Sequence, residues 1–176
     1  MKKNVLKELY LKWDGTHTNF LKEVYEANCS DTSFIPLTIT LFAKNNELEV
    51  STTWILKHHV EKGGEIAAND LEQLLKRGAT LRNWESQLHF LQIIPKISLS
   101  KKQAEQLEPS IRPLLFSDKK FVKAAAFTAY FEVVKLIQEL QHEFLLLCED
   151  ALERSTASVK VRIRRVLKYL KPEKNS

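Results

Sequence analysis

Residues 107–127 read LEPSIRPLLFSDKKFVKAAAF. The first part has apolar residues at helical spacing and contains two prolines, Pro109 and Pro113. A short turn at Asp118 separates this part from a second helix that begins near Val122. The alanines of the second helix allow a close approach to its neighbours, because helix axes come nearer where side chains are small. The stretch therefore predicts a helical hairpin whose second helix packs inside a stack.

Hairpins of this kind recur along the chain. Their second helices have similar starts around Val50, Trp84, Val122 and Val161, at steps of 34, 38 and 39 residues. Helical hairpins repeated at such a period are typical of α-solenoids, in which each hairpin buries its apolar face against the next. The spacing thus predicts about four stacked hairpins.

Helical periodicity covers nearly the whole chain, and no segment shows a convincing two-residue period. Ile35–Leu41 does contain β-branched residues, which also suit a strand. With 4 glycines and 5 prolines, the chain has few turn residues, which argues against a β-sandwich or a barrel. Expected helices span residues 5–13, 20–28, 33–44, 48–58, 69–77, 82–95, 101–116, 118–138, 140–153 and 157–170.

The stretch 107–127 resembles a HEAT repeat. In that family the first helix contains a proline, the turn contains an acid, and the second helix starts with valine and a base before small residues. Pro109 or Pro113 matches the proline and Asp118 matches the acid. Val122 and Lys123 match the valine–base pair.

The resemblance covers residues 31–171, where Val161-Arg162 repeats the valine–base pair. It implies an all-α, right-handed α-solenoid of about four HEAT-like hairpins, with extra N-terminal helices in residues 1–30 and a tail at 172–176. We expect these parts to form one domain over residues 1–176. The resemblance also implies a partner held along the concave face of the second helices. It implies no chemistry, because proteins of this fold differ widely in what they bind.

Positive charge is concentrated at the end of the chain. The net charge is +5, yet residues 155–176 contain seven bases and one acid, so the rest has a net charge of −1. The expected last helix has an apolar stripe of Val159, Ile163, Val166, Leu167 and Leu170. A basic stripe accompanies it, made of Lys160, Arg164, Lys168 and Lys171 and flanked by Arg162 and Arg165.

This basic helix fits several roles. It suits an acidic protein partner, a nucleic acid whose phosphates it would track, or an anionic membrane surface. It also suits a terminal helix that is polar outside only for solubility. An acidic protein partner is our main expectation, and nucleic acid is the alternative. The residues we expect to bind the partner are Lys160, Arg164, Arg165, Lys168 and Lys123, with Trp54 as an apolar anchor and His58 beside it. The aromatic residues near Ala126 are assigned mainly to the core, and an exposed ligand groove is the alternative for them: Phe127, Tyr130 and Phe131.

Catalytic motifs are missing from the sequence, which indicates a non-enzymatic scaffold without a cofactor or metal. His58-His59 is a poor metal pair, because adjacent helical side chains diverge by about 100°. Alkylpurine DNA glycosylases, which are built of HEAT-like repeats, are a third alternative. In those enzymes a concave face combines aromatic residues with an acid, but here His58 follows Trp54 by four residues, and no acid stands four after Trp84.

Cys29 and Cys148 lie far apart and fit two buried thiols in a reducing compartment. The charged N-terminus does not read as a signal peptide, and no apolar run is long enough to span a bilayer. We therefore expect a soluble, cytoplasmic protein. Its oligomeric state stays open, since exposed solenoid ends can stack.

Overall fold

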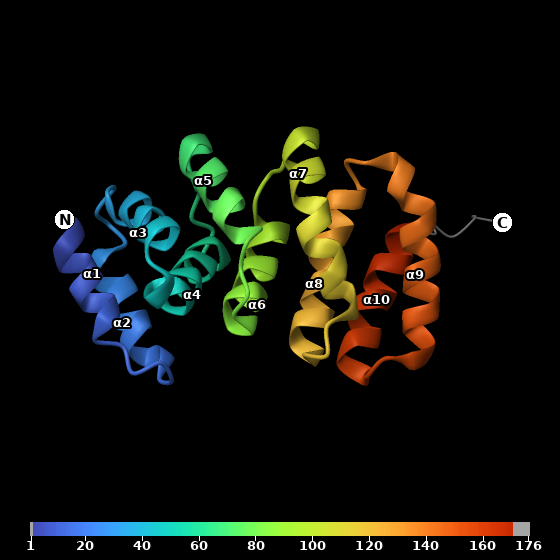
Figure 1. Ribbon diagram of the computed structural model, residues 1–176, viewed down its shortest axis with the longest axis horizontal. Coiled ribbons are helices and arrows are strands. Elements are labelled where there is room, and N and C mark those ends of the chain that lie inside the picture. The colour runs from blue at the N-terminus through green and yellow to red at the C-terminus, as the bar shows by residue number, and fades with distance from the viewer. Residues whose placement is uncertain (1, 171–176) are drawn as a thin grey trace. The chain divides into compact units, whose positions relative to one another are not determined.

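A computed structural model describes residues 2–170 of the chain, and within them it contains ten α-helices and no β-strand. The prediction of an all-α fold is confirmed (Figure 1). Ile35–Leu41 lies in a helix despite its β-branched residues. The tail expected at 172–176 and the last basic residue of the stripe, Lys171, lie outside the described residues.

Contacts divide the chain into two compact units, residues 1–97 and residues 98–176. The single domain expected over 1–176 stays a prediction. The N-terminal unit contains α1 (Lys3–Leu11), α2 (Thr18–Asn28), α3 (Phe34–Lys44), α4 (Glu49–Glu61), α5 (Ala68–Gly78) and α6 (Trp84–Ile93). The C-terminal unit contains α7 (Lys101–Ile111), α8 (Lys120–Val134), α9 (Gln141–Arg154) and α10 (Ala157–Leu170).

Helices of the N-terminal unit pack in two rows. In one row α1 contacts α3 and α3 contacts α5, and in the other α2 contacts α4 and α4 contacts α6. The α3–α4 hairpin joins the rows (Figure 1). The middle helix α4 buries Ser51, Thr52 and Thr53 together with Ile55 and Leu56. The three hydroxyls each donate to a backbone carbonyl one turn earlier, so these small polar side chains are satisfied inside the helix that carries them.

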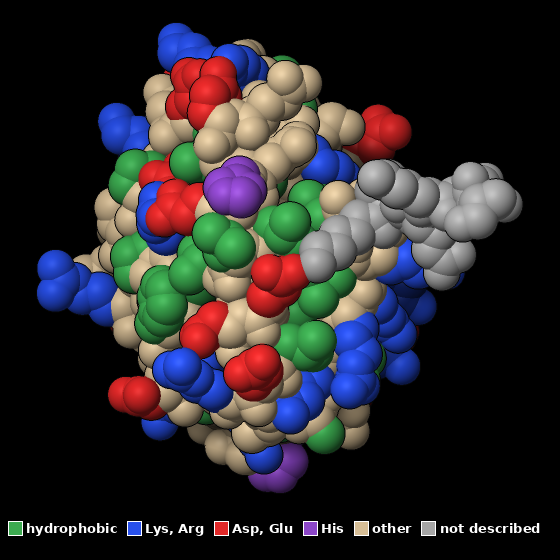
Figure 2. Space-filling view, turned by 90° about the vertical axis from the view of Figure 1, so that its right-hand side faces the viewer, with side chains coloured by type: hydrophobic (Ala, Val, Ile, Leu, Met, Phe, Trp, Pro, Cys, Tyr) green, Lys and Arg blue, Asp and Glu red, His purple; other side chains and the backbone are tan. Residues whose placement is uncertain are grey.

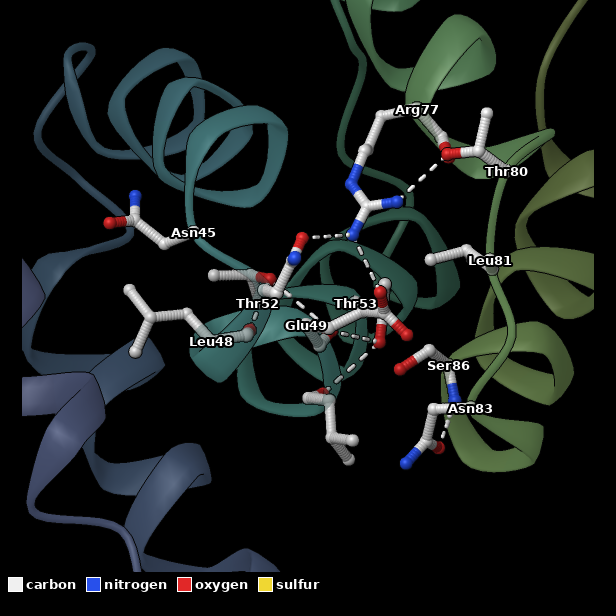
Figure 3. Close-up of polar contacts among 12 residues, drawn as sticks. Asn45, Leu48, Glu49, Thr52, Thr53, Arg77, Thr80, Leu81, Asn83 and Ser86 are labelled. Atoms are coloured by element: carbon white, nitrogen blue, oxygen red, sulfur yellow. Dashed lines mark hydrogen bonds and ion pairs between the residues drawn. The ribbon is translucent and has the colours of Figure 1, made fainter.

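An arginine joins the start of α4 to the end of α5 (Figure 3). The Arg77 guanidinium donates to Glu49 Oε2 at 2.6 Å and to Asn46 Oδ1 at 2.9 Å, and its other terminal nitrogen donates to Thr80 Oγ1 at 2.8 Å. The side chains of Arg77 and Glu49 are only 17% and 12% exposed. Because water screens this pair less than an open surface pair, it holds the two helix ends in register.

Gly78 brings α5 and α6 together. A Cβ atom built on this glycine would lie 2.1 Å from Cε2 of Phe90, which is itself buried in α6. The last turn of α5 can therefore pack against the Phe90 ring only because residue 78 has no side chain.

In the C-terminal unit, α8 is the central helix. It contacts α7, α9 and α10, and α9 also contacts α10. Ala124, Ala126 and Ala129 are buried in it, as the sequence predicts for a closely packed second helix. Tyr130 donates from α8 to Glu108 Oε1 of α7 at 2.7 Å. Arg112 bridges the same carboxylate to Glu143 of α9.

The helix boundaries agree with the sequence to within three residues except at two places. The helix expected over 101–116 changes at Ile111 into a 3-10 turn, Arg112–Phe116, because Pro113 has no N–H to continue the α-helical bonding. The helix expected over 118–138 ends at Val134, where Leu136 and Ile137 bond to carbonyls three residues back. One cysteine also differs from expectation, since Cys148 is buried but Cys29 is exposed near the end of α2. None of the helices in residues 2–170 has both the length and the apolar character that a membrane crossing needs.

Gly78→Ala should destabilise the protein. Alanine normally favours a helix over glycine, by about 1 kcal/mol. Here the new methyl group meets the Phe90 ring, so we expect the free energy of unfolding to fall by about 1–3 kcal/mol in urea titrations. Lys76→Ala, at an exposed position of the same helix, is the control and should change it by less than about 0.5 kcal/mol. Adding Phe90→Leu should recover part of the loss, and a Gly78→Ala variant as stable as the parent would contradict the packing.

Candidate partner-binding groove

The C-terminal unit has a groove of about 340 Å³ between α8 and α10. This volume is at the small end of the range for ligand pockets, which is about 300–1,000 Å³. Among the described residues, its walls come from these two helices and from Lys135, which follows the last residue of α8. The residues that line it are Thr128, Phe131, Glu132, Lys135, Arg162, Arg165, Val166 and Tyr169.

Helical spacing places these residues together. On α8 the lining residues stand at relative positions 0, +3, +4 and +7 from Thr128, which is one face of a helix. On α10 they stand at 0, +3, +4 and +7 from Arg162. The buried Val166 anchors the α10 wall, while its neighbours Arg162, Arg165 and Tyr169 are exposed. The groove therefore runs along the junction of two packed helices.

Two aromatic rings form its apolar part. The centroids of Phe131 and Tyr169 lie 5.7 Å apart, with the rings tilted by 34°. Tyr169 is 75% exposed, whereas Phe131 is half-buried. Lys135 Nζ lies 5.2 Å from the centre of the Phe131 ring and forms an ion pair with Glu132. One cation of the groove is thus already neutralised by the acid next to it.

The two arginines of the groove are different. Arg162 and Arg165 form no ion pair with any residue in the described part of the chain, whereas Arg112 and Arg154 each pair with an acid on their own helix or in its extension. Three residues apart on a helix, they project from neighbouring positions of one face. Their positive charge is therefore available to a ligand at the rim of the groove.

The structure distributes the expected basic residues over more than one side of α10. Arg165 lines the groove, but among the described lining residues Lys160, Arg164 and Lys168 do not occur. Lys160 is half-buried and donates to the Glu153 carbonyl at 3.3 Å. Figure 2, which looks onto the α9–α10 end of this unit, shows Lys and Arg side chains gathered most densely toward the lower right, with apolar and acidic groups elsewhere. Lys123 is half-buried in α8 and likewise does not line the described groove.

The other two expected residues lie in the N-terminal unit, where α4 brings them together. Trp54 and His58 stack with ring centroids 4.9 Å apart and planes at 13°. The buried Tyr25 of α2 meets His58 edge-on at 4.8 Å, and Lys57 Nζ lies 5.3 Å from the centre of the Trp54 ring. Trp54 is half-buried, so the stack is a packed part of this surface.

Two histidines of this unit have lowered pKa values because they are buried. Burial lowers the pKa of His58, and Lys62 and Lys57 lower it further against the opposing effect of Glu61. Within residues 2–170, His58 Nε2 is buried without a hydrogen-bond partner. His89 of α6 has its Nδ1 3.1 Å from Thr53 Oγ1. Burial and the nearby Lys57 lower the pKa of His89 to about 3.

Sequence reasoning missed most of the groove. It assigned Phe131, Phe127 and Tyr130 mainly to the core, with an exposed ligand groove as the alternative. Phe127 and Tyr130 are buried, whereas Phe131 lines the groove. It also missed Lys135 and did not select Tyr169 as a binding residue. The missing signal is a second stripe of α10, formed by Arg162, Arg165 and Tyr169 at helical spacing.

Comparison with family models, with curated proteins and with solved structures found no match to this chain. Within residues 2–170, no group of three or more histidine, cysteine, aspartate and glutamate side chains has an arrangement that could hold a metal ion.

His89 should make folding sensitive to acid. The unfolded imidazole has a pKa near 6.5, whereas the folded one stays neutral until about pH 3. Below pH 6.5 the unfolded chain therefore binds a proton that the folded chain rejects, and stability falls as the pH drops toward 3. Between pH 7 and pH 5 the free energy of unfolding of the parent should fall by up to about 2 kcal/mol because of His89. In His89→Gln this contribution should be absent, so the free energy of unfolding should fall by that much less.

Urea titrations at both pH values measure this difference. His142→Gln is the control, because His142 is exposed on α9 and its imidazole is hydrated in both states. Equal pH dependence of the parent and His89→Gln would contradict the assignment.

Proposed function

We propose that the chain is a non-enzymatic interaction module, a HEAT-like α-solenoid that holds an acidic segment of a partner protein against α8 and α10. The separate rows of odd-numbered and even-numbered helices in the N-terminal unit support the repeat architecture. In the C-terminal unit, the groove lies between two even-numbered helices, which correspond to the second helices of the repeats.

The observation that carries the proposal is the pairing of charge and aromatic surface in one groove. Arg162 and Arg165 have no acidic partner among the described residues, and they stand beside the Phe131–Tyr169 pair. Guanidinium groups bind carboxylates through paired hydrogen bonds, and arginine and tyrosine are enriched where proteins bind one another. The groove thus combines the residue types that anchor a protein segment.

An acidic protein fits this groove better than a nucleic acid. Glu132, which pairs with Lys135, can still accept hydrogen bonds from the backbone N–H groups of a peptide, whereas the phosphates of a strand have no donor to offer it. A single strand also needs successive rings on which bases stack, and the described residues of the groove provide two rings, Phe131 and Tyr169. A nucleic acid would instead need the bases outside the groove, Lys160, Arg164 and Lys168, as a track along α10.

Charge reversal on two sides of α10 tests the proposal. The first variant is Arg162→Glu with Arg165→Glu, and the matched control is Arg164→Glu with Lys168→Glu, which changes the net charge equally on the same helix. Fluorescence anisotropy follows a short labelled peptide in which glutamates and aspartates surround one phenylalanine, and labelled oligo-dT and duplex DNA, at about 50 and 200 mM salt. We expect the peptide to bind the parent and to lose at least about tenfold in affinity with the groove variant, but less than about threefold with the control.

Three results would overturn the proposal. The first is the absence of peptide binding at the lower salt. The second is equal weakening by the two variants, which would place binding in the general charge of α10. The third is tighter binding of DNA than of peptide, lost mainly in the Arg164→Glu, Lys168→Glu control, which would establish the nucleic-acid alternative.

A further inference from the structure

Resting on the proposed function, we infer that the α8–α10 groove recognises a two-part element: a carboxylate and an aromatic or large aliphatic side chain beside it in the same partner segment. The groove is lined both by two exposed arginines and by a pair of aromatic rings, which are separate residues. An acidic segment without an apolar side chain fills only half of this surface.

The apolar wall consists of Tyr169, Phe131 and Val166. Tyr169 leaves most of its ring in water although it lies 5.7 Å from Phe131, which continues the same surface inward. An apolar side chain placed against these rings removes apolar area from water on both molecules, which favours binding. Tyrosine suits a rim position, since its ring packs while its hydroxyl stays hydrated.

The charged rim consists of Arg162 and Arg165. Both are exposed, and both lack an ion pair with the described residues, so a ligand need not displace an internal partner. Lys135 contributes less, because Glu132 already pairs with it and its ammonium group lies over Phe131. The arginine rim therefore provides the site for the carboxylate.

Two smaller features orient a peptide rather than a free acid. Thr128 and Glu132 lie on the α8 wall, opposite the arginines of α10. A hydroxyl and a carboxylate can accept hydrogen bonds, and backbone N–H groups of a peptide can donate them. Phosphate groups, fully ionised, have no such donors to offer Glu132. A peptide can thus donate to the acceptors of α8 while its carboxylate binds the arginines of α10.

A pair of peptides of equal charge tests this inference. The first is the labelled acidic peptide with one phenylalanine, and the second replaces that phenylalanine with serine. Anisotropy titrations with the parent should show about tenfold tighter binding of the phenylalanine peptide. Tyr169→Ala should reduce this preference to less than about threefold, and Tyr169→Phe should keep it.

Matched controls distinguish binding in the groove from nonspecific binding to exposed aromatic residues. Phe121→Ala removes another exposed aromatic ring, which α8 carries outside the described groove, and should leave the preference unchanged. Because Tyr169 is largely exposed, Tyr169→Ala should unfold at the same urea concentration as the parent. A double Arg162→Gln, Arg165→Gln variant should weaken both peptides to a similar extent.

The outcomes distinguish the inference from the proposal beneath it. Equal binding of the two peptides, with no effect of Tyr169→Ala, overturns the two-part element but leaves an acidic partner in place. Failure of both peptides to bind overturns the proposed function and this inference together. Loss of oligo-dT binding in Tyr169→Ala, without peptide binding, assigns the rings to base stacking and also overturns it.

Discussion

The helices of each unit bury their apolar sides against one another, and the other features of the described residues depend on that constraint. The central helix of the C-terminal unit, α8, contacts three others and so can leave only a narrow strip uncovered. Alanines at the contacts bring the helices close, and larger residues such as Phe131 stand where the contact with α10 opens. The groove therefore lies along the part of α8 that the neighbouring helices leave uncovered. Its lining residues are those that the core did not enclose.

The two units achieve close packing through different side chains. In the N-terminal unit, α4 is lined with serine and threonine residues whose hydroxyls bond to its own backbone. In the C-terminal unit, α8 uses alanines at the corresponding contacts. Either choice keeps side chains short, and the hydroxyls incur no lasting desolvation cost because each has a partner. Polar contacts such as Arg77–Glu49 then fix the helix ends, where apolar burial is least.

Helix positions follow largely from local sequence, whereas the groove does not. Apolar spacing and breakers act within a few residues, so nearly every helix was predictable, and the early end of the helix at Ile111 follows from Pro113. On α10 the apolar stripe is flanked by bases on both sides, Arg162 and Arg165 on one and Lys160 and Arg164 on the other. Periodicity alone does not say which flank adjoins α8. That choice is made by tertiary packing, and it also decides that Phe131 is half-buried rather than enclosed.

The bases of α10 have a consequence for the free protein, because Arg162 and Arg165 form no ion pair with any residue in 2–170. Ala157–Leu170 contains no acidic residue, and its bases stand three or four positions apart, as Arg162 and Arg165 or Arg164 and Lys168 do. Like charges at these spacings repel and weaken a helix by some tenths of a kcal/mol per pair. The bases of α10 therefore repel one another, and dissolved salt screens this repulsion. The stability of the helix should rise with ionic strength. Salt weakens a surface that is held together by ion pairs, so the expected response of α10 to salt has the opposite sign.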